Sequence, residues 1–381
     1  MRNDQFDAPS RIIPALLISA IGALFYNILP LYVGTAQDSL ALTSSAVGFL
    51  TAAFFAGYNL VTASAFFWIR RWNWRRATAF WLPLALLSML ASLSTQQFAL
   101  LLLLTFIAGG GFAAIYGIGT TILADTSNPA RWMGVKIATE ALPGAVLLFV
   151  LPGQIVETYG FQGVVIAMVL SCIVMALALK NLPSHGREVD DAVAETHPEA
   201  QARIIAVFLS LTATLLFFSA ASGIWAFIER LGVDLQFDAE AIGSLLAVTL
   251  LTAAVGSLLT AWLGQRYGNI KPFMYSVVMF VVGLWALWGT PSFSTFASGV
   301  CLITFAIGMG LPFAVAEVAE ADPDGRFVVL SVPAIGLGAM IGPAMAGWLA
   351  DLSGFSVVMA CVGIGVALSA VVMSFVSQQR Q

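Results

Sequence analysis

Twelve runs of predominantly apolar residues follow one another along the chain, separated by polar segments. An α-helix needs about 17–25 apolar residues to cross a hydrocarbon core about 30 Å thick. Each run has about that length, so each predicts one transmembrane helix. The predicted spans are residues 11–33, 44–69, 77–94, 98–123, 132–156, 161–180, 203–228, 239–264, 271–290, 294–319, 326–350 and 355–376.

The longest polar segment, residues 181–202, divides these runs into two groups of six. It is rich in Glu, Asp, Pro and Ala and cannot bury enough apolar surface to fold by itself, which predicts a flexible linker. We therefore expect an N-terminal six-helix bundle over residues 1–180 and a C-terminal six-helix bundle over residues 203–381. The predicted fold class is an all-α polytopic membrane protein.

The composition supports this prediction, since 60% of the residues are hydrophobic and only 9% are charged. A soluble domain has about 25% charged and about 45–50% apolar residues. A core cannot hold so large an apolar excess, so the outer surface must face lipid. The three cysteines, Cys172, Cys301 and Cys361, lie inside apolar runs without the spacing of metal ligands. We expect no disulfide, metal or cofactor.

Positive charge is distributed unevenly between the two sides of the predicted membrane. If the N-terminus is cytoplasmic, all but one of the 16 Lys and Arg residues lie on the cytoplasmic side, and Arg230 is the exception. The positive-inside rule requires such a bias. This pattern predicts a multi-pass protein of a bacterial-type inner (plasma) membrane, with both termini and the linker cytoplasmic.

Charged residues of the first half recur in the second half, always 195 positions later. The recurring pairs are Arg71 with Arg266, Arg76 with Lys271, Asp125 with Glu320 and Arg131 with Arg326. An even number of helices in each half preserves the topology, so the halves are predicted to be parallel repeats about an axis along the membrane normal.

The loop before the ninth predicted span contains a recognisable motif, Ala261-Trp262-Leu263-Gly264-Gln265-Arg266-Tyr267-Gly268. With this loop, two six-helix halves and a central linker, the chain resembles the major facilitator superfamily over essentially its full length. The signature loop of that family reads Gly-x-x-x-Asp-Arg-x-Gly-Arg-Arg. This chain keeps the Arg-x-Gly core but has Gln265 in place of the acid, and its first-half loop, residues 68–76, keeps only a basic cluster.

This resemblance implies twelve transmembrane helices in two six-helix pseudo-repeats and a cavity lined by the first, fourth, seventh and tenth helices. Proton-driven exporters of the family carry Gly-Pro-x-x-Gly-Gly in the fifth helix. Here the fifth predicted helix has Pro143-Gly144 and Pro152-Gly153, and the closest match, Gly342 to Gly347, lies in the eleventh. The chain length and Leu29-Pro30-Leu31-Tyr32 are similar to the small drug/proton-antiporter branch. Symport and antiport therefore both remain open.

Glu140 is the clearest ionisable residue at membrane depth. At about 1.5 Å per residue it lies roughly 14 Å into the fifth helix, counted from Arg131, and Lys136 precedes it by one turn on the same face. An ionisable group there costs about 2.5–3.5 kcal/mol on insertion scales. Glu140 is either a proton-coupling carboxylate that alternates between Lys136 and a proton, or one partner of a permanent ion pair. Because His185 and His197 both lie in the linker, a proton carrier within the membrane would have to be a carboxylate, unless another ion is coupled or coupling is absent.

Polar and aromatic residues in the predicted helices are candidates for a solute cavity, although each type is also common in helix packing and at membrane interfaces. These candidates are Tyr26, Asn27, Asn59, Tyr116, Thr120 and Trp225.

Charged residues at the ends of the predicted helices are candidates for gates. On the cytoplasmic side they are Asp125, Arg131, Glu320, Arg326, Arg71, Arg76, Arg266 and Lys271. They could equally be helix-terminal charges whose exposed pairs contribute about 0–1 kcal/mol each. Glu317 is expected to belong to an acidic, solvated mouth. Arg230 lies on the outer side. Its functional interpretation is that it attracts an anionic solute or closes an outer gate, and the structural alternative is a surface pair with Glu229 or Asp234.

These observations favour a secondary active transporter that moves a small organic solute by alternating access, coupled to protons. No nucleophile elbow, phosphate loop or metal-ligand cluster is present, so we expect neither an enzyme nor a primary pump. The expected partners are a small-molecule solute, a proton or another ion and the lipid bilayer, without nucleic acid, for a monomeric protein. The alternatives are a proton-driven drug or metabolite exporter, a lipid flippase, and a transporter-like sensor.

Overall fold

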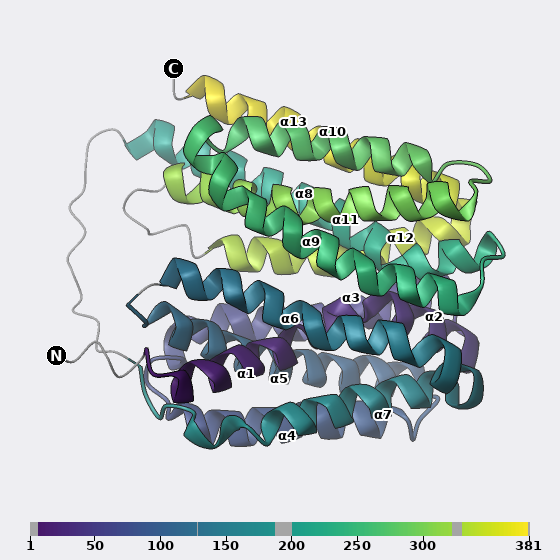
Figure 1. Cartoon of the computed structure of the whole chain (residues 1–381), viewed down its shortest axis with the longest axis horizontal. Helices are drawn as coiled ribbons and strands as arrows, with labels where there is room; N and C mark the ends of the chain where they lie inside the picture. The colour runs from purple at the N-terminus through teal and green to yellow at the C-terminus, as the bar shows by residue number, and fades with distance from the viewer. Residues whose placement is uncertain (1–6, 128, 187–199, 322–329, 380–381) are drawn as a thin grey trace.

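The computed structural model describes residues 7–127, 129–186, 200–321 and 330–379, and these residues form a bundle of long helices without a strand (Figure 1). In the N-terminal half the helices are α1 (Pro9–Asn27), α2 (Leu29–Leu40), α3 (Ser44–Trp68), α4 (Trp74–Ser92), α5 (Phe98–Ala124), α6 (Pro129–Leu151) and α7 (Glu157–Ala176). In the C-terminal half they are α8 (Ala200–Asp234), α9 (Ala239–Tyr267), α10 (Ile270–Ala286), α11 (Phe293–Ala321), α12 (Ser331–Ser353) and α13 (Phe355–Gln379).

This architecture confirms the all-α membrane fold and is consistent with twelve spans. Within the described residues, nine segments are long and apolar enough to cross a membrane, and one of them, Arg131–Ala176, is 46 residues long and contains two predicted spans. The other two predicted spans fall on α4 and α10, which are shorter or less apolar.

The first span is longer than the apolar pattern indicates, because α2 continues it to Leu40 instead of ending near residue 33. The helix breaks at Ile28, where ψ is 9°. Pro30 lies in the first turn of α2, where its missing N–H leaves no hydrogen bond unmade. A second break precedes the sixth span, where Gly160 takes a φ of 51° that L-residues with side chains rarely adopt.

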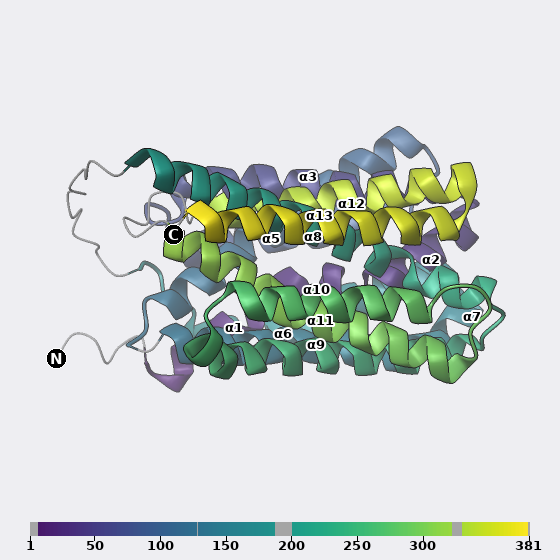
Figure 2. The same ribbon diagram turned by 90° about the horizontal axis from the view of Figure 1, so that it is seen from above.

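Helices α1 to α7 form one half of the bundle, and α8 to α13 lie beside them as the other half (Figure 1). The halves meet along two seams, one between α3 and α12 and the other between α6 and α9, on opposite sides of the molecule (Figure 2). Glycines permit close approach at both seams. A Cβ on Gly347 would overlap the backbone of Ser44, and a Cβ on Gly243 would overlap the carbonyl oxygen of Leu148.

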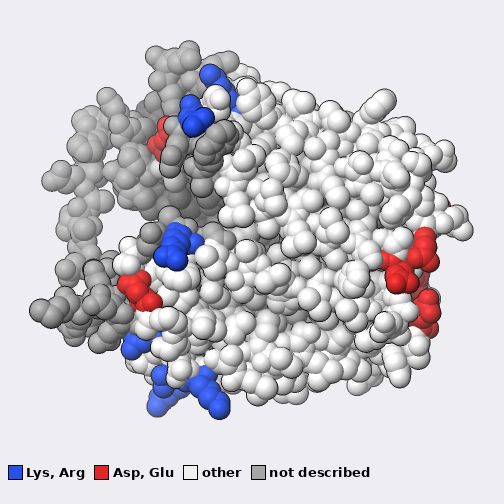
Figure 3. All heavy atoms as spheres, in the orientation of Figure 1, with Lys and Arg blue, Asp and Glu red and all other residues white. Residues whose placement is uncertain are grey.

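Charge distinguishes the two ends of the bundle. We call the end at which α1 begins and α13 ends the basic end, and the opposite end the far end. On the face drawn in Figure 3, Lys and Arg gather at the basic end together with a few acidic residues, whereas the charged residues seen at the far end are Asp and Glu. Such a distribution is the one that the positive-inside rule produces in a bundle that spans a membrane.

The first residues of the predicted linker contact the N-terminal half. Asn181 closes a short 3-10 turn, and the following residues pack against the basic end of the N-terminal half. The Trp74 backbone N–H donates to the carbonyl oxygen of Ser184 at 2.7 Å, and the Arg75 side chain donates to the Leu182 carbonyl. Backbone partners explain this order in a segment whose composition lacks a hydrophobic core. Residues 187–199 of the linker lie outside the described residues.

Candidate functional site

Lys136 and Glu140 form an ion pair in the middle of α6. The Lys136 Nζ lies 2.7 Å from Oε1 of Glu140. Nζ also donates to the hydroxyl of Tyr116 at 2.7 Å and lies 4.0 Å from the centre of that ring. The two side chains are only 6% and 12% exposed. Each charge therefore offsets the desolvation of the other, and the tyrosine ring adds cation–π attraction.

Asn27 connects this pair to the first span. Its Nδ2 donates to the backbone carbonyl of Glu140 at 2.7 Å. The Trp225 indole donates to the backbone carbonyl of Tyr26 at 2.9 Å, which joins α8 of the other half to the neighbouring residue of α1. The structure thus brings Tyr26, Asn27 and Trp225 into the same region as the ion pair. The Tyr26 carbonyl lies two residues before the break at Ile28.

The two remaining predicted cavity residues lie elsewhere or have local partners. The Thr120 hydroxyl donates to the backbone carbonyl of Tyr116 at 2.9 Å, which is an ordinary bond within a helix. Asn59 lies at the seam between α3 and α12, against Gly336. Within the described residues neither amide atom of Asn59 has a hydrogen-bond partner, although both are buried. Asn59 is therefore a polar group of the interface between the halves.

Aromatic residues that the sequence analysis did not select connect these positions. Tyr58 lies 6.1 Å from the Tyr116 ring, and Phe55 lies 6.1 Å from Tyr58. Tyr26 in turn lies 6.1 Å from Phe55 and 5.7 Å from Phe218 of α8. The signal for the two α3 residues was their spacing of three on one helix face. Phe218 could not be found in this way, because its contact joins the two halves.

At the basic end, the predicted gate residues form contacts within each half. Nη1 of Arg70 lies 2.7 Å from Oδ2 of Asp125, which links the loop after α3 to the end of α5. The amide of Asn269 donates to Glu320 at 2.7 Å, and the Arg131 guanidinium lies 5.2 Å above the ring of Trp132. The predicted gate residues Arg71, Arg76, Arg266 and Lys271 are exposed at this end. Arg326 lies outside the described residues.

Glu317 corrects the expectation of an acidic, solvated mouth. Its side chain lies on α11 one turn before the helix ends, and the residue is only 1% exposed. Sequence distance to the helix end suggested solvent, but packing of neighbouring helices covers this turn.

Arg230 connects the halves at the far end. Its guanidinium donates to both carboxylate oxygens of Asp38, at 2.6 and 2.7 Å, and its Nε donates to Glu229 at 2.9 Å. Asp38 belongs to α2 of the N-terminal half, whereas Arg230 and Glu229 belong to α8. Glu229, one of the two predicted neighbours, is thus a partner of Arg230. The bidentate bond, however, goes to Asp38, which is 192 positions away in the sequence.

Asp351 makes a second polar connection between the halves at the far end. Its carboxylate accepts the backbone N–H groups of Ser44 and Ser45, at 2.9 and 2.7 Å. These are the first residues of α3, where helix N–H groups have no partner within the helix and where negative charge is stabilised by the helix dipole. A carboxylate of α12 therefore caps a helix of the other half.

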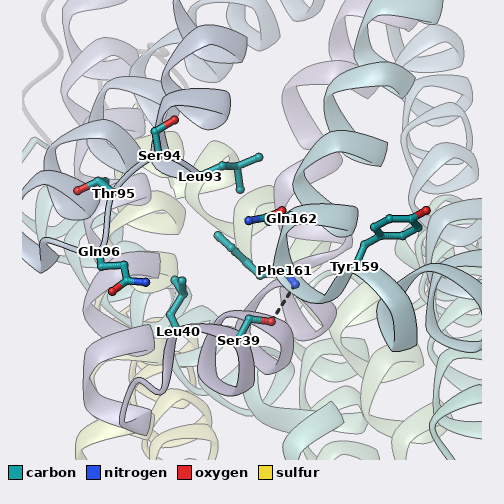
Figure 4. A pocket seen from close by; sticks show the side chains of 9 residues that line it. All are labelled: Ser39, Leu40, Leu93, Ser94, Thr95, Gln96, Tyr159, Phe161 and Gln162. Atoms are coloured by element: carbon teal, nitrogen blue, oxygen red, sulfur yellow. Dashed lines mark hydrogen bonds between the residues drawn. The ribbon is translucent and has the colours of Figure 1, made fainter.

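A separate cavity of about 460 Å³ opens at the far end of the N-terminal half, between α2, the loop before α5 and the start of α7 (Figure 4). Its lining includes Ser39, Gln96 and Gln162 and carries no charged residue. The Ser39 hydroxyl accepts the backbone N–H of Phe161 at 3.0 Å, which caps the helix after the break at Gly160 (Figure 4). This cavity contains none of the predicted site residues, so it does not belong to the Lys136–Glu140 region.

Comparison with known proteins agrees with the architecture. The structure is similar to that of a mutant of the nucleoside transporter NupG, with a TM-score of 0.73 and 13% identity over 97% of this chain and 100% of that chain. NupG itself gives a TM-score of 0.70 and 12% identity over 98% of this chain and 100% of that chain. A third similar structure is that of a bacterial homologue of the human lysosomal transporter Spinster, in an inward-facing and unoccupied conformation. Its TM-score is 0.66, with 15% identity over 98% of this chain and 96% of that chain. At these identities the likeness establishes the fold.

No curated protein sequence matches this chain. A sequence model described as Major Facilitator Superfamily matches residues 210–380, which contain α9 to α13 and most of α8. Residues 210–380 therefore match the Major Facilitator Superfamily model, and the chain as a whole has the fold of the transporters named above.

Proposed function

We propose that this protein is a secondary active transporter that moves a small organic solute across the membrane by alternating access, with coupling to protons. The observation that carries the proposal is the Lys136–Glu140 ion pair, held at membrane depth against Tyr116. Intramembrane ionisable groups are costly and mark ion or solute pathways. The nucleoside transporter and the Spinster homologue with the same fold support solute transport.

Glu140 is the proton carrier in this mechanism. When its carboxylate takes up a proton it becomes neutral, and its attraction to Lys136 is lost. The Lys136 ammonium keeps its hydrogen bond to Tyr116 and gains freedom to bind an acceptor atom of the solute. When the proton leaves on the other side, the ion pair forms again and the solute loses this partner. Protonation and solute binding are thereby linked through one ammonium group.

The moving bodies in this proposal are the bundles of residues 1–180 and 203–381, joined by the linker. The far end is closed in this conformation by the Arg230–Asp38 bond and by the cap that Asp351 supplies to α3. Opening the far end requires both contacts to break while the halves rock about the two seams. By the positive-inside rule, the basic end faces the cytoplasm of a bacterial-type cell.

The test is a solute-induced pH change in proteoliposomes that contain the full chain. A panel of labelled small organic compounds is screened with the wild type, with Glu140→Gln and with Glu157→Gln, which removes an exposed far-end carboxylate. We expect the wild type and Glu157→Gln to move protons together with a solute. Glu140→Gln is expected to retain solute exchange without a pH change.

Glu140→Gln leaves the Lys136 charge buried without its carboxylate, so this variant could lose its fold instead of its coupling. The double variant Lys136→Gln/Glu140→Gln removes both charges and avoids that outcome. If either folded variant still couples solute movement to protons, Glu140 is a structural ion-pair partner and the coupling mechanism is refuted.

A further inference from the structure

Five aromatic side chains form a continuous row through the middle of the molecule, which we call the aromatic row. Successive ring centres are 5.7 to 6.1 Å apart. The members, in spatial order, are Tyr116, Tyr58, Phe55, Tyr26 and Phe218. They come from α5, α3, α1 and α8, so the row begins beside the Lys136–Glu140 pair and ends in the other half of the molecule.

Exposure divides the row into two kinds of residue. Phe55 and Phe218 are 5% and 6% exposed and serve as packing. Tyr26, Tyr58 and Tyr116 remain partly exposed, although they lie in the middle of long helices. The members of the row that keep some exposed surface are therefore its tyrosines.

The tyrosine hydroxyl groups are not used equally. The Tyr116 hydroxyl accepts a hydrogen bond from the Lys136 ammonium. Across the part of the chain that the structure describes, the hydroxyls of Tyr26 and Tyr58 form no hydrogen bond. Tyrosine hydroxyls at such depth usually have a partner. The hydroxyls of Tyr26 and Tyr58 are therefore two donors that a bound molecule could engage.

In the state that follows proton release, Glu140 is ionised and the charge at the start of the row sums to zero, because Lys136 and Glu140 carry opposite charges. A solute with a net charge would leave one charge without compensation at membrane depth, which is costly. A neutral or zwitterionic solute avoids that cost. Its polar edge would find a donor in Lys136 and an acceptor in Glu140, 2.7 Å apart.

We infer that the transported solute is a planar ring compound without net charge, which stacks on Tyr26 and Tyr58 and places a polar edge against Lys136, Tyr116 and Glu140. This inference rests on the proposed function and names its substrate class. Tyrosine rings stack well on planar rings, in offset or edge-to-face geometry, and gain little from a saturated ring of equal size. Tyr26 also touches Phe218 of the other half, so a solute on its ring lies where the halves meet.

Matched pairs of probes separate ring stacking from other binding. Uridine is compared with ribose, and benzamide with cyclohexanecarboxamide, by equilibrium binding to the full chain in nanodiscs. We expect the planar compound of each pair to bind at least tenfold more tightly. Tyr58→Leu and Tyr26→Leu should each weaken binding of the planar compounds about 3- to 10-fold, while Tyr58→Phe keeps the ring and changes binding less.

The control variant is Tyr275→Leu, the same substitution at a tyrosine of α10 that is 59% exposed and lies outside the row. It should leave every affinity unchanged. Equal binding of planar and saturated probes, or unchanged binding of the planar probes in Tyr58→Leu and Tyr26→Leu, overturns the inference.

Transport of the same probes by counterflow in proteoliposomes distinguishes this failure from failure of the proposed function. If an acyclic solute is transported in a Glu140-dependent manner and the tyrosine variants transport it normally, transport stands and the substrate class is wrong. If planar probes bind through the tyrosines but are never moved, the substrate class stands and the proposed transport is wrong.

Discussion

The contacts that close the far end lead to a quantitative prediction. Asp38→Asn removes the charge that holds Arg230 across the halves, while Glu229 remains to pair with the guanidinium. Asp351→Ala removes the carboxylate that caps α3 from the other half, while Thr43 remains as the cap that belongs to the helix itself. Both carboxylates belong to contacts between the halves, so each substitution should favour the conformation in which the far end is open.

The exposure of these groups sets the size of the effect. The Asp38 side chain is 64% exposed, so solvent screening reduces its contribution to that of a surface pair, about 0.2–1 kcal/mol. Loss of a helix cap costs about 0.5–2 kcal/mol. The two sites share no partner, so their effects should add to about 1–3 kcal/mol. Since 1.4 kcal/mol corresponds to a factor of ten, the ratio of open to closed molecules should rise roughly 5- to 150-fold.

The measurement is a distance distribution between spin labels at Gln96→Cys and Thr290→Cys, two exposed far-end positions in opposite halves. Cys172, Cys301 and Cys361 are first replaced by alanine. The double variant should gain population at longer distances, with each single variant intermediate, and added salt should mimic only the loss of Asp38. Glu157→Ala serves as a control that removes another far-end carboxylate. An unchanged distribution in the double variant, or the same change in the control, refutes the latch role of these contacts.

Three further predictions concern the site and one seam. Lys136→Met or Glu140→Leu alone should destabilise the protein by about 3–5 kcal/mol, whereas the double variant should lose much less, as measured by thermal unfolding in detergent. Tyr116→Phe removes the hydroxyl that accepts from Lys136 and should lower solute exchange while keeping the ring stack, which counterflow measures. Gly347→Ala should destabilise the closed seam because its Cβ would meet the Ser44 backbone, and cysteine labelling at the far end should become faster.

The helices could be predicted from the sequence because the membrane sets their length. Runs of about 20 apolar residues identify a span almost independently of its neighbours. The same logic misplaced the end of the first span, since α2 contains Gln37 and Asp38 and therefore looks like a polar loop. Those residues lie at the far end, where Asp38 meets Arg230.

The candidate site could be predicted only where it is local in sequence. Lys136 and Glu140 are one helical turn apart, so their contact follows from helix geometry. The Asp38 partner of Arg230 and the Asp351 cap of α3 cross between the halves, and no local pattern encodes them. Glu317 shows the opposite error, because tertiary packing buried a carboxylate that sequence position placed in solvent.

The Gly342 to Gly347 stretch shows how a motif can have a purely structural role. Its closest counterpart in the resembled family lies in the fifth helix of proton-driven exporters. In this structure a Cβ on Gly48 of α3 would overlap the carbonyl of Pro343, and Gly347 lies against Ser44. The stretch therefore forms the surface of α12 that allows α3 to approach closely. Its presence is explained by packing at the seam, and it carries no information about the direction of transport.

The closure at the far end is asymmetric, although the two halves of the chain are repeats. Glu157 precedes Gly160 and Phe161 as Asp351 precedes Gly354 and Phe355, so the two carboxylates hold equivalent positions in the repeat. Symmetry would therefore have Glu157 cap α9 as Asp351 caps α3. Helix α9 already has its own cap, because Asp238 accepts the backbone N–H of Ala241 at 3.0 Å. Glu240 adds another negative charge in the first turn of α9. Helix α3 has a cap of its own as well, since Thr43 accepts the backbone N–H of Ala46 at 3.2 Å, but it has no acidic residue in its first turn. A carboxylate from the opposite half therefore has more to gain at α3 than at α9, where Glu240 already supplies negative charge. Among the described residues the carboxylate cap between halves is found at the α3–α12 seam, so opening of the far end has to break it there.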